Sequence, residues 1–275
     1  YMACISNLLD SSQKHISPSL INNSNKKYFL TFQHENCIES SDLLIQQANN
    51  LKYFDECILE KKCNIIKDNE FYKQLKNDKF NFTFNSEKGC GFYLWKPYII
   101  YKHLKNINEG DYIVYSDPGG KFPTNPILIC WTKNKLTQYL NNIQNNKGCL
   151  CFDSGYVQYV TTKFEIFKHF NLHCDFDFYN SNSKTSCLHF IRKCPYTMKV
   201  YESWWNCAKQ NPFLFNDCIC QYDIVKGFIE PRNEQSVWSA ICYVMDVDLC
   251  EDNPSKRPIR ISSRPLALSL TSLLN

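Results

Sequence analysis

The sequence lacks any apolar run close to the roughly 20 residues that a membrane-spanning helix needs. It also lacks a basic stripe, because lysines and acidic residues interleave and the net charge is only +4. Nucleic-acid-binding domains usually carry a clustered basic surface. No charged-then-apolar segment typical of a signal peptide is present, and no internal repeat is visible. These absences exclude a membrane-spanning protein, predict no nucleic-acid partner, and favour a cytoplasmic protein.

Although the chain has 16 cysteines, no two of them form a CxxC pair. The pairs Cys149/Cys151 and Cys218/Cys220 have the spacing of same-face neighbours on a strand rather than that of zinc-knuckle ligands. Disulfide scaffolds are typical of short secreted chains that cannot build a core. Here 44% of the residues are hydrophobic, which is enough for a core. We therefore expect reduced cysteines that pack as small apolar residues.

The length of 275 residues suits one large domain with short extensions. Residues 1–26 are rich in Ser and Asn without a clear period, which predicts a loosely ordered arm. Residues 27–255 are predicted to form a single domain, and residues 256–275 a C-terminal tail. The tail places several leucines after a basic stretch. We expect these leucines to pack on the domain or on a second subunit, as in a homo-oligomer, rather than on lipid.

Short apolar runs alternate with segments of helical period from residue 27 onward. Strands are expected over residues 28–32, 56–59, 112–115, 149–152 and 188–191. Three helices are expected to begin at side-chain caps: Ser40 or Ser41, Asp68 or Asn69, and Thr162 with Glu165 as a capping box. Another helix is expected over residues 135–145, and three more from Pro97, Pro195 and Pro231. This alternation predicts an α/β fold of Rossmann-like type, with a mainly parallel central sheet flanked by helices.

The segment of residues 88–97 combines two glycines with a Trp95-Lys96 pair before an expected helix start. Glycine permits close approach of the backbone to a ligand. A tryptophan face, a cation and free helix N–H groups suit an anionic ligand. The alternative is an ordinary loop whose aromatic side chains fill the core.

Two further segments carry carboxylates. Asp117 follows an expected buried strand and precedes glycines, at the strand end where open α/β sheets bind ligands. It could hold Mg²⁺ or Mn²⁺ beside a diphosphate, or simply form a turn. Glu234 begins the last expected helix, where it could be a general base or only a favourable helix-end charge. From the residues alone, the helix-end role is favoured for Glu234.

Together the three segments resemble GT-A type nucleotide-sugar glycosyltransferases of large DNA viruses of protists and algae and of some bacteria. That family carries a Gly-x-Gly-Tyr-Trp-x-Trp-Lys-Pro block, a Gly-Asp-apolar-Tyr-x-Asp-Ala-Gly block, and a late block ending in Gln-Ser-aromatic. Here these are residues 89–97, 110–119 and 232–238, and the resemblance spans roughly residues 27–248. The chain departs from the pattern at residues 92–94, at Pro118, and in lacking the second carboxylate of Asp-x-Asp.

The resemblance implies a GT-A fold and the transfer of a sugar from a nucleotide-diphosphate donor, expected to be a UDP-sugar. The acceptor would be a hydroxyl of a glycan, protein or lipid-linked molecule, and the location a virus factory or virion. The residues it assigns are Thr31, Lys88, Trp95, Lys96 and Gly119 for the donor, Asp117 for Mn²⁺ or Mg²⁺, and Glu234 or, second, Asp217 for the base. The alternative is a catalytically inactive protein that binds nucleotide sugars or carbohydrate, because the second carboxylate is missing.

Overall fold

The structure is a computed structural model, which describes residues 25–119, 132–218 and 227–250. Nearly all of the predicted N-terminal arm and the whole predicted C-terminal tail, with its expected leucine packing, lie outside these residues. Cys220 of the second close cysteine pair lies outside them as well. Within the described ranges, no helix combines the length and apolar character needed to cross a membrane.

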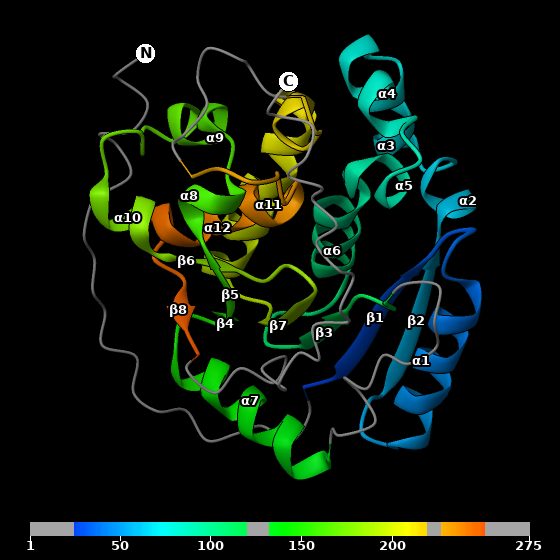
Figure 1. Cartoon of the computed structure of the whole chain (residues 1–275). Coiled ribbons are helices and arrows are strands. Elements are labelled where there is room, and N and C mark those ends of the chain that lie inside the picture. Colours follow the sequence, from blue (N-terminus) through cyan, green and yellow to red (C-terminus); the bar gives the residue numbers. More distant parts are fainter. Residues whose placement is uncertain (1–24, 120–131, 219–226, 251–275) are drawn as a thin grey trace, which may run out of the picture.

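A six-stranded sheet forms the centre of the molecule, in the order β2-β1-β3-β7-β4-β8 (Figure 1). Its strands are β1 (Lys27–Gln33), β2 (Glu56–Lys61), β3 (Tyr112–Ser116), β4 (Cys149–Cys151), β7 (Leu188–Arg192) and β8 (Asp248–Leu249). Strands β2, β1 and β3 are mutually parallel, and β4 is parallel to β8. Strand β7 runs antiparallel to both of its neighbours, β3 and β4. The predicted mainly parallel sheet is confirmed, with one reversed strand that the sequence did not reveal.

Helices cover both faces of this sheet, and a smaller sheet lies beside it (Figure 1). The longer helices are α1 (Ile38–Asn50), α6 (Trp95–Asn106), α7 (Lys133–Asn145), α11 (Pro195–Gln210) and α12 (Glu234–Val244). The short ones are α2 (Lys62–Ile65), α3 (Asn69–Leu75), α4 (Asp78–Phe84), α5 (Gly89–Phe92), α8 (Gln158–Thr161), α9 (Phe164–His169), α10 (Phe176–Asn180) and the 3₁₀ turn η3 (Pro212–Leu214). Strands β5 (Asp153–Val157) and β6 (Asn182–Lys184) form the small antiparallel sheet.

Alternate side chains of each central strand enter two different hydrophobic cores. In β3, Ile113 and Tyr115 join the core that includes α6, α11 and α12, whereas Tyr112 and Val114 join the core that includes α1 and α7. This is the period of two that a strand buried on both faces imposes. The first core also contains the fully buried indoles of Trp204, Trp205 and Trp238.

The cysteines of the described residues all carry free thiols. Cys149 and Cys151 lie on β4, are both buried, and enter the same core. Their side chains therefore share one strand face and pack as small apolar residues, as their spacing predicted.

Helix caps were predicted less well than the helices themselves. Helix α1 begins at Ile38, so the expected caps Ser40 and Ser41 lie inside it and donate to the carbonyl oxygens of Cys37 and Ile38 at 3.1 and 2.8 Å. The hydroxyl of Thr162 donates to Gln158, and α9 begins without a side-chain cap. These predictions were wrong because short hydroxyl side chains have several competing local acceptors. The expected cap Asp68 is confirmed, because it accepts a hydrogen bond from the Glu70 N–H at 3.0 Å.

Candidate functional site

A pocket of about 380 Å³ opens where β1 and β3 end at their carboxyl termini. Phe32 and His34 reach it from the end of β1, and Asp117 and Gly119 from the segment after β3. Parallel strands in an open α/β sheet place the residues that follow them at a common edge, where ligands of such folds bind. The pocket therefore lies where the sequence predicted a ligand site.

Lys96 is the centre of a buried charged trio behind this pocket. Its Nζ lies 2.8 Å from Asp117 Oδ2 and 2.8 Å from Glu234 Oε1, and its side chain has no exposed surface. Burial by itself would lower the pKa of the lysine, but the Asp117 and Glu234 carboxylates outweigh it and raise the pKa above its usual value. The ammonium therefore stays charged and holds the two carboxylates together.

The position of Lys96 differs from the one expected from sequence. Helix α6 begins at Trp95 rather than after Lys96, so both residues lie in its first turn and are buried. The enclosed ammonium does not face solvent in this conformation. Lys96 thus acts on the pocket through Asp117, and its direct contact with a phosphate stays a prediction.

Asp117 joins the trio to the pocket. Its Oδ2 accepts from Lys96, its Oδ1 accepts from the hydroxyl of Tyr115, and about a quarter of its side chain remains exposed. Burial, followed by the charge of Asp117, raises the pKa of Tyr115 well above its usual value, so the phenol stays a donor. Asp117 is therefore a fixed hydrogen-bond acceptor in the wall of the pocket.

The expected divalent cation fits Asp117 poorly. Mg²⁺ and Mn²⁺ prefer several hard oxygen ligands, and both Asp117 oxygens already accept hydrogen bonds. Among the described residues, Asp117 belongs to no group of three His, Cys, Asp or Glu side chains with ligand atoms close together. Metal binding at Asp117 stays a prediction.

Glu234 closes the trio from the first turn of α12. Its Oε1 accepts from Lys96 Nζ at 2.8 Å and from the Ser186 hydroxyl at 2.9 Å. Burial raises the pKa of Glu234 above its usual value, and the Lys96 charge opposes that rise. A carboxylate with a raised pKa is a stronger base once ionised, so the geometry is compatible with more than a helix-end role.

His189, on the reversed strand β7, is hydrogen-bonded to Ser186, the residue that donates to Glu234. Its Nε2 lies 3.1 Å from the Ser186 carbonyl oxygen and its Nδ1 lies 3.0 Å from the Tyr201 hydroxyl. Burial, and after it the charge of Lys96, lowers the pKa of His189 to about 3. The imidazole is therefore neutral near pH 7 and fixes the segment that carries Ser186.

Aromatic side chains form one wall of the pocket. Trp95 stacks on Phe32 with ring centroids 3.7 Å apart, and its Nε1 donates to the Gly89 carbonyl oxygen at 2.9 Å. Gly89 has φ +57°, and a Cβ there would lie 2.4 Å from the Tyr93 ring. The glycine therefore allows Tyr93 to pack into the same wall, which offers aromatic surface to a ligand.

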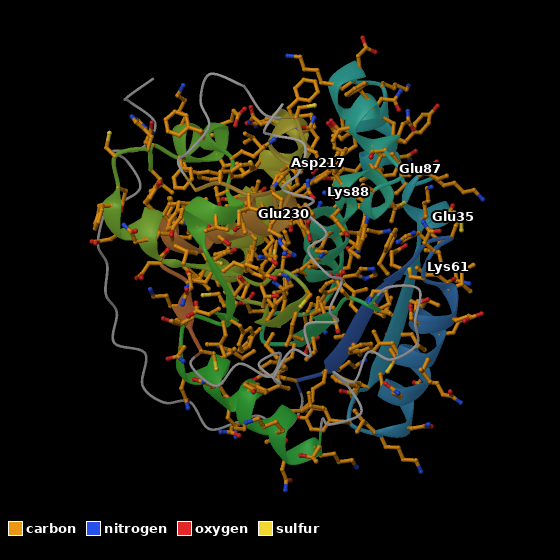
Figure 2. The ribbon with its side chains drawn as sticks, in the orientation of Figure 1. Glu35, Lys61, Glu87, Lys88, Asp217 and Glu230 are labelled. Carbon is orange, nitrogen blue, oxygen red and sulfur yellow. The ribbon has the colours of Figure 1, made fainter. Side chains whose placement is uncertain are left out.

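Two other predicted residues, Lys88 and Asp217, form an exposed ion pair outside this pocket (Figure 2). Lys88 Nζ lies 2.8 and 2.9 Å from the two Asp217 oxygens, and Asp217 also accepts from Asn233 Nδ2 at 2.8 Å. Asp217 lines a separate hollow with Phe82 and Phe92. The structure thus brings the two residues together, next to the segments that carry Gly89 and Glu234.

The last two predicted residues differ in their access to the pocket. Gly119 is exposed and lines it, with φ +82°. Thr31 has no exposed surface, and its hydroxyl donates to the Ser116 carbonyl oxygen at 2.8 Å. In this conformation Thr31 ties the ends of β1 and β3 together behind the pocket wall.

Sequence reasoning missed several residues of the site. Tyr115 could have been found, because it precedes Asp117 by two positions and strand periodicity places the two side chains on one face. Ser186 and His189 carry no local pattern, because their role depends on the pairing of β7 with β3. His34, which lines the pocket directly after β1, was missed as well. The only sequence signal for it was its position immediately after an expected strand.

No protein-family model matches this chain, and no curated protein sequence matches it. A solved structure described as a glycosyltransferase involved in the glycosylation of the major capsid of PBCV-1 is a distant structural neighbour, with a TM-score of 0.37 and 10% sequence identity. The match covers 68% of this chain and 69% of that one. At this similarity the match assigns no activity to the chain.

Proposed function

We propose that this protein is a glycosyltransferase that moves a sugar from a nucleotide-diphosphate donor, a UDP-sugar, to a hydroxyl acceptor. The observation that carries the proposal is the trio of Lys96, Asp117 and Glu234 beside a pocket at the carboxyl edge of parallel strands. Such an edge suits a nucleotide, and carboxylates commonly act at the reacting centre when a glycosidic bond is hydrolysed. The resemblance of the three sequence blocks points in the same direction.

The donor would lie along the pocket. The aromatic wall of Phe32, Trp95 and Tyr93 suits a base or the apolar face of a sugar. Asp117, which is held rigidly by Lys96 and Tyr115, would accept hydrogen bonds from donor hydroxyls. Gly119 would let the backbone approach the diphosphate closely.

The accessible cation that we assign to the diphosphate is Lys88. It stands between Glu87 and Gly89, which both line the pocket, and about half of its side chain is exposed. A cation close to the leaving diphosphate stabilises the negative charge that grows in the transition state. None of the proposed steps requires a metal ion.

Glu234 is the proposed general base. In the transfer, the acceptor oxygen forms a bond to the anomeric carbon, the bond from that carbon to the diphosphate oxygen breaks, and the acceptor proton passes to Glu234. Its Oε1 is occupied by Lys96 and Ser186, and no described residue donates a hydrogen bond to Oε2. The second oxygen is therefore the one that would receive the proton.

A protein that binds nucleotide sugars without turning them over is the second candidate. The observation that favours it is the enclosure of the trio, since Lys96 has no exposed surface and only 7% of the Glu234 side chain is exposed. In that case the trio would serve only to fix the pocket wall.

The deciding experiment measures donor binding and sugar release separately, with a panel of UDP-sugars, with and without Mn²⁺. We expect the unaltered protein to bind and turn over one of them. Glu234→Gln should retain binding and lose about 10²- to 10⁴-fold in turnover, the usual contribution of a general base. Asp117→Asn should weaken binding as well. Glu56→Gln, which changes an exposed carboxylate on β2, is the matched control and should behave like the unaltered protein.

The outcomes separate the two candidates. Binding without sugar release in every condition would favour the binding protein. Absence of binding to every nucleotide sugar would contradict both.

A further inference from the structure

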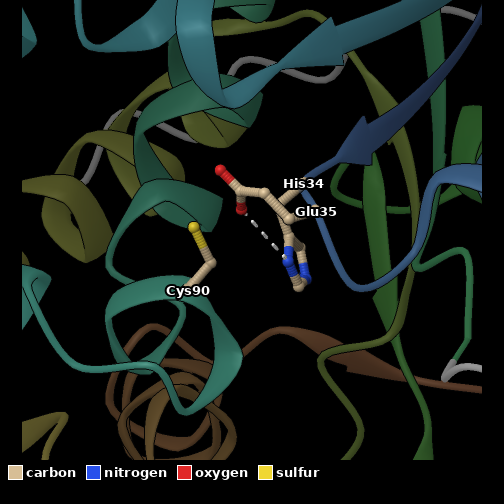
Figure 3. A group of neighbouring side chains, drawn as sticks. All are labelled: His34, Glu35 and Cys90. Atoms are coloured by element: carbon tan, nitrogen blue, oxygen red, sulfur yellow. Dashed lines mark ion pairs between the residues drawn. The ribbon is translucent and has the colours of Figure 1, made fainter.

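His34, Glu35 and Cys90 converge at the rim of the candidate pocket, outside the charged trio (Figure 3). One potential ligand atom from each lies within 4.8 Å of the other two. Two residues come from the segment after β1 and the third from α5, so the group joins two parts of the chain. Glu35 extends from its segment toward Cys90 in Figure 3. Within the described ranges, no other group of three such side chains is this compact.

The backbone fixes both halves of this group. The turn after β1 is closed by the Cys37 N–H, which donates to the His34 carbonyl oxygen at 3.0 Å. Cys90 has left-handed backbone angles, φ 53° and ψ 58°, which residues other than glycine rarely adopt. It is held there because its N–H donates to the Glu87 carbonyl oxygen at 3.2 Å and the Gly91 N–H donates to the Ser86 carbonyl oxygen at 2.8 Å. These hydrogen bonds fix the backbone from which the Cys90 thiol extends.

The group already attracts a cation from within the chain. Lys62 Nζ lies 3.3 Å from Glu35 Oε1, and Lys62 lines the same cavity as Cys90. The His34 ring reaches the same place, because its Nδ1 lies 4.0 Å from Glu35 Oε2. One carboxylate, one thiol and one imidazole thus line one cavity together with an ammonium ion that could be displaced.

We propose that His34, Glu35 and Cys90 form a binding site for one Zn²⁺ ion. A mixed set of nitrogen, oxygen and sulfur donors suits this borderline cation, whereas Mg²⁺ and Mn²⁺ prefer oxygen ligands. On binding, the Cys90 sulfur forms a bond to the metal, its proton passes to solvent, and the Lys62 ammonium leaves Glu35. Three protein ligands leave a fourth position for water or a ligand group.

The position of the site gives it a consequence for the pocket. His34 lines both the candidate pocket and a neighbouring cavity of about 350 Å³, which Glu35, Lys62 and Cys90 also line. A metal bound there would tie the segment after β1 to the Gly89–Phe92 turn. Both segments contribute residues to the lining of the candidate pocket, so the ion would stiffen it. The inference concerns metal binding and does not depend on the proposed activity.

The test uses the full chain freed of metal by a chelator, with Zn²⁺ alone as the probe for calorimetry and thermal unfolding. Co²⁺ replaces Zn²⁺ for absorption spectroscopy, because a cobalt–thiolate bond gives a charge-transfer band. The unaltered protein is expected to bind one Zn²⁺, to gain thermal stability with it, and to show that band. Cys90→Ser should lose the band and weaken Zn²⁺ binding by roughly tenfold or more.

Matched variants make the result specific to this group. Cys63→Ser removes an exposed thiol on the neighbouring helix α2 and should bind Zn²⁺ as the unaltered protein does. Lys62→Met should bind Zn²⁺ more tightly, because no ammonium has to leave.

His34→Gln, which leaves Cys90 in place, should weaken binding even if Cys90→Ser folds poorly. Absence of Zn²⁺ binding, a cobalt–thiolate band that persists in Cys90→Ser, or weaker binding in Lys62→Met would overturn the proposal.

Discussion

Two lysine–carboxylate clusters stand close to one another in this molecule, and they differ in their access to water. Lys96 lies between Asp117 and Glu234 with no exposed surface, whereas Lys88 and Asp217 are each more than two-fifths exposed. The contact distances are the same, 2.8 Å in each case. Geometry alone therefore does not distinguish the two clusters, but burial does.

The comparison teaches where a charge pair affects folding and where it affects only recognition. Water screens the exposed pair, so such pairs contribute about 0–1 kcal/mol. The buried trio has lost its hydration, and removal of one partner would leave unpaired charge in a poorly solvated place. Lys96 is thus expected to contribute to both the stability of the fold and the function of the site, whereas Lys88 can exchange Asp217 for a ligand.

The largest effect is expected for Lys96→Met. Without the ammonium, Asp117 and Glu234 repel each other, so the free energy of unfolding should fall by about 3–5 kcal/mol near pH 7. The pKa of Glu234, already raised by burial, would rise further. A raised pKa lets the folded variant bind a proton more readily than the unfolded chain does. The loss in free energy of unfolding caused by Lys96→Met should therefore shrink as pH falls and grow as pH rises through the pKa of Glu234. Urea unfolding at several pH values measures both effects, and a pH-independent loss below about 1 kcal/mol would contradict the prediction.

The next effect concerns His189, which holds the trio's partner Ser186. Its pKa is lowered to about 3, against 6.5 for an ordinary histidine, so between these values the unfolded chain binds a proton that the folded one does not. Stability should therefore fall as pH decreases from 6.5, by about 1.4 kcal/mol per pH unit from this residue. His189→Gln should unfold with a correspondingly flatter pH dependence in urea. Equal pH slopes for the two proteins would show that His189 does not remain neutral in the folded state.

The part of the site that the sequence predicted is the part that is local in the chain. Asp117 follows a run of buried residues, so its place at a strand end could be read directly from residues 112–117. The two glycines around Cys90 were expected to permit close approach of a ligand to the backbone; both have positive φ values, and the approach of a ligand stays a prediction. The place of Glu234 at the start of a helix was predicted from its position after Pro231, whereas its role as a candidate base came only from the resemblance.

The part that could not be predicted depends on contacts between distant segments. Nothing near Lys96 indicates that α12 will bring Glu234 to the same ammonium, because the two residues are 138 positions apart. The direction of β7 has no local signature either, since a short apolar run pairs equally well in both directions. As a result, Ser186 and His189 were missed. Lys96 was expected to face a ligand because the start of α6 was placed two residues too late.

The smallest effects are expected for the exposed cluster, and they test whether it serves recognition. Lys88→Met and Asp217→Asn should each change the free energy of unfolding by less than about 1 kcal/mol, and less still at high salt, because water and ions screen the pair. If Lys88 meets the donor diphosphate, Lys88→Met should raise the donor KM severalfold, whereas Asp217→Asn releases the lysine and should leave KM unchanged or lower it.

Turnover should stay within a few fold in Asp217→Asn, because Glu234 and not Asp217 is the proposed base. Steady-state kinetics of both variants and of the double variant separate these roles. A large fall in kcat for Asp217→Asn, with binding intact, would instead assign the base to the exposed cluster and leave the buried trio as its scaffold.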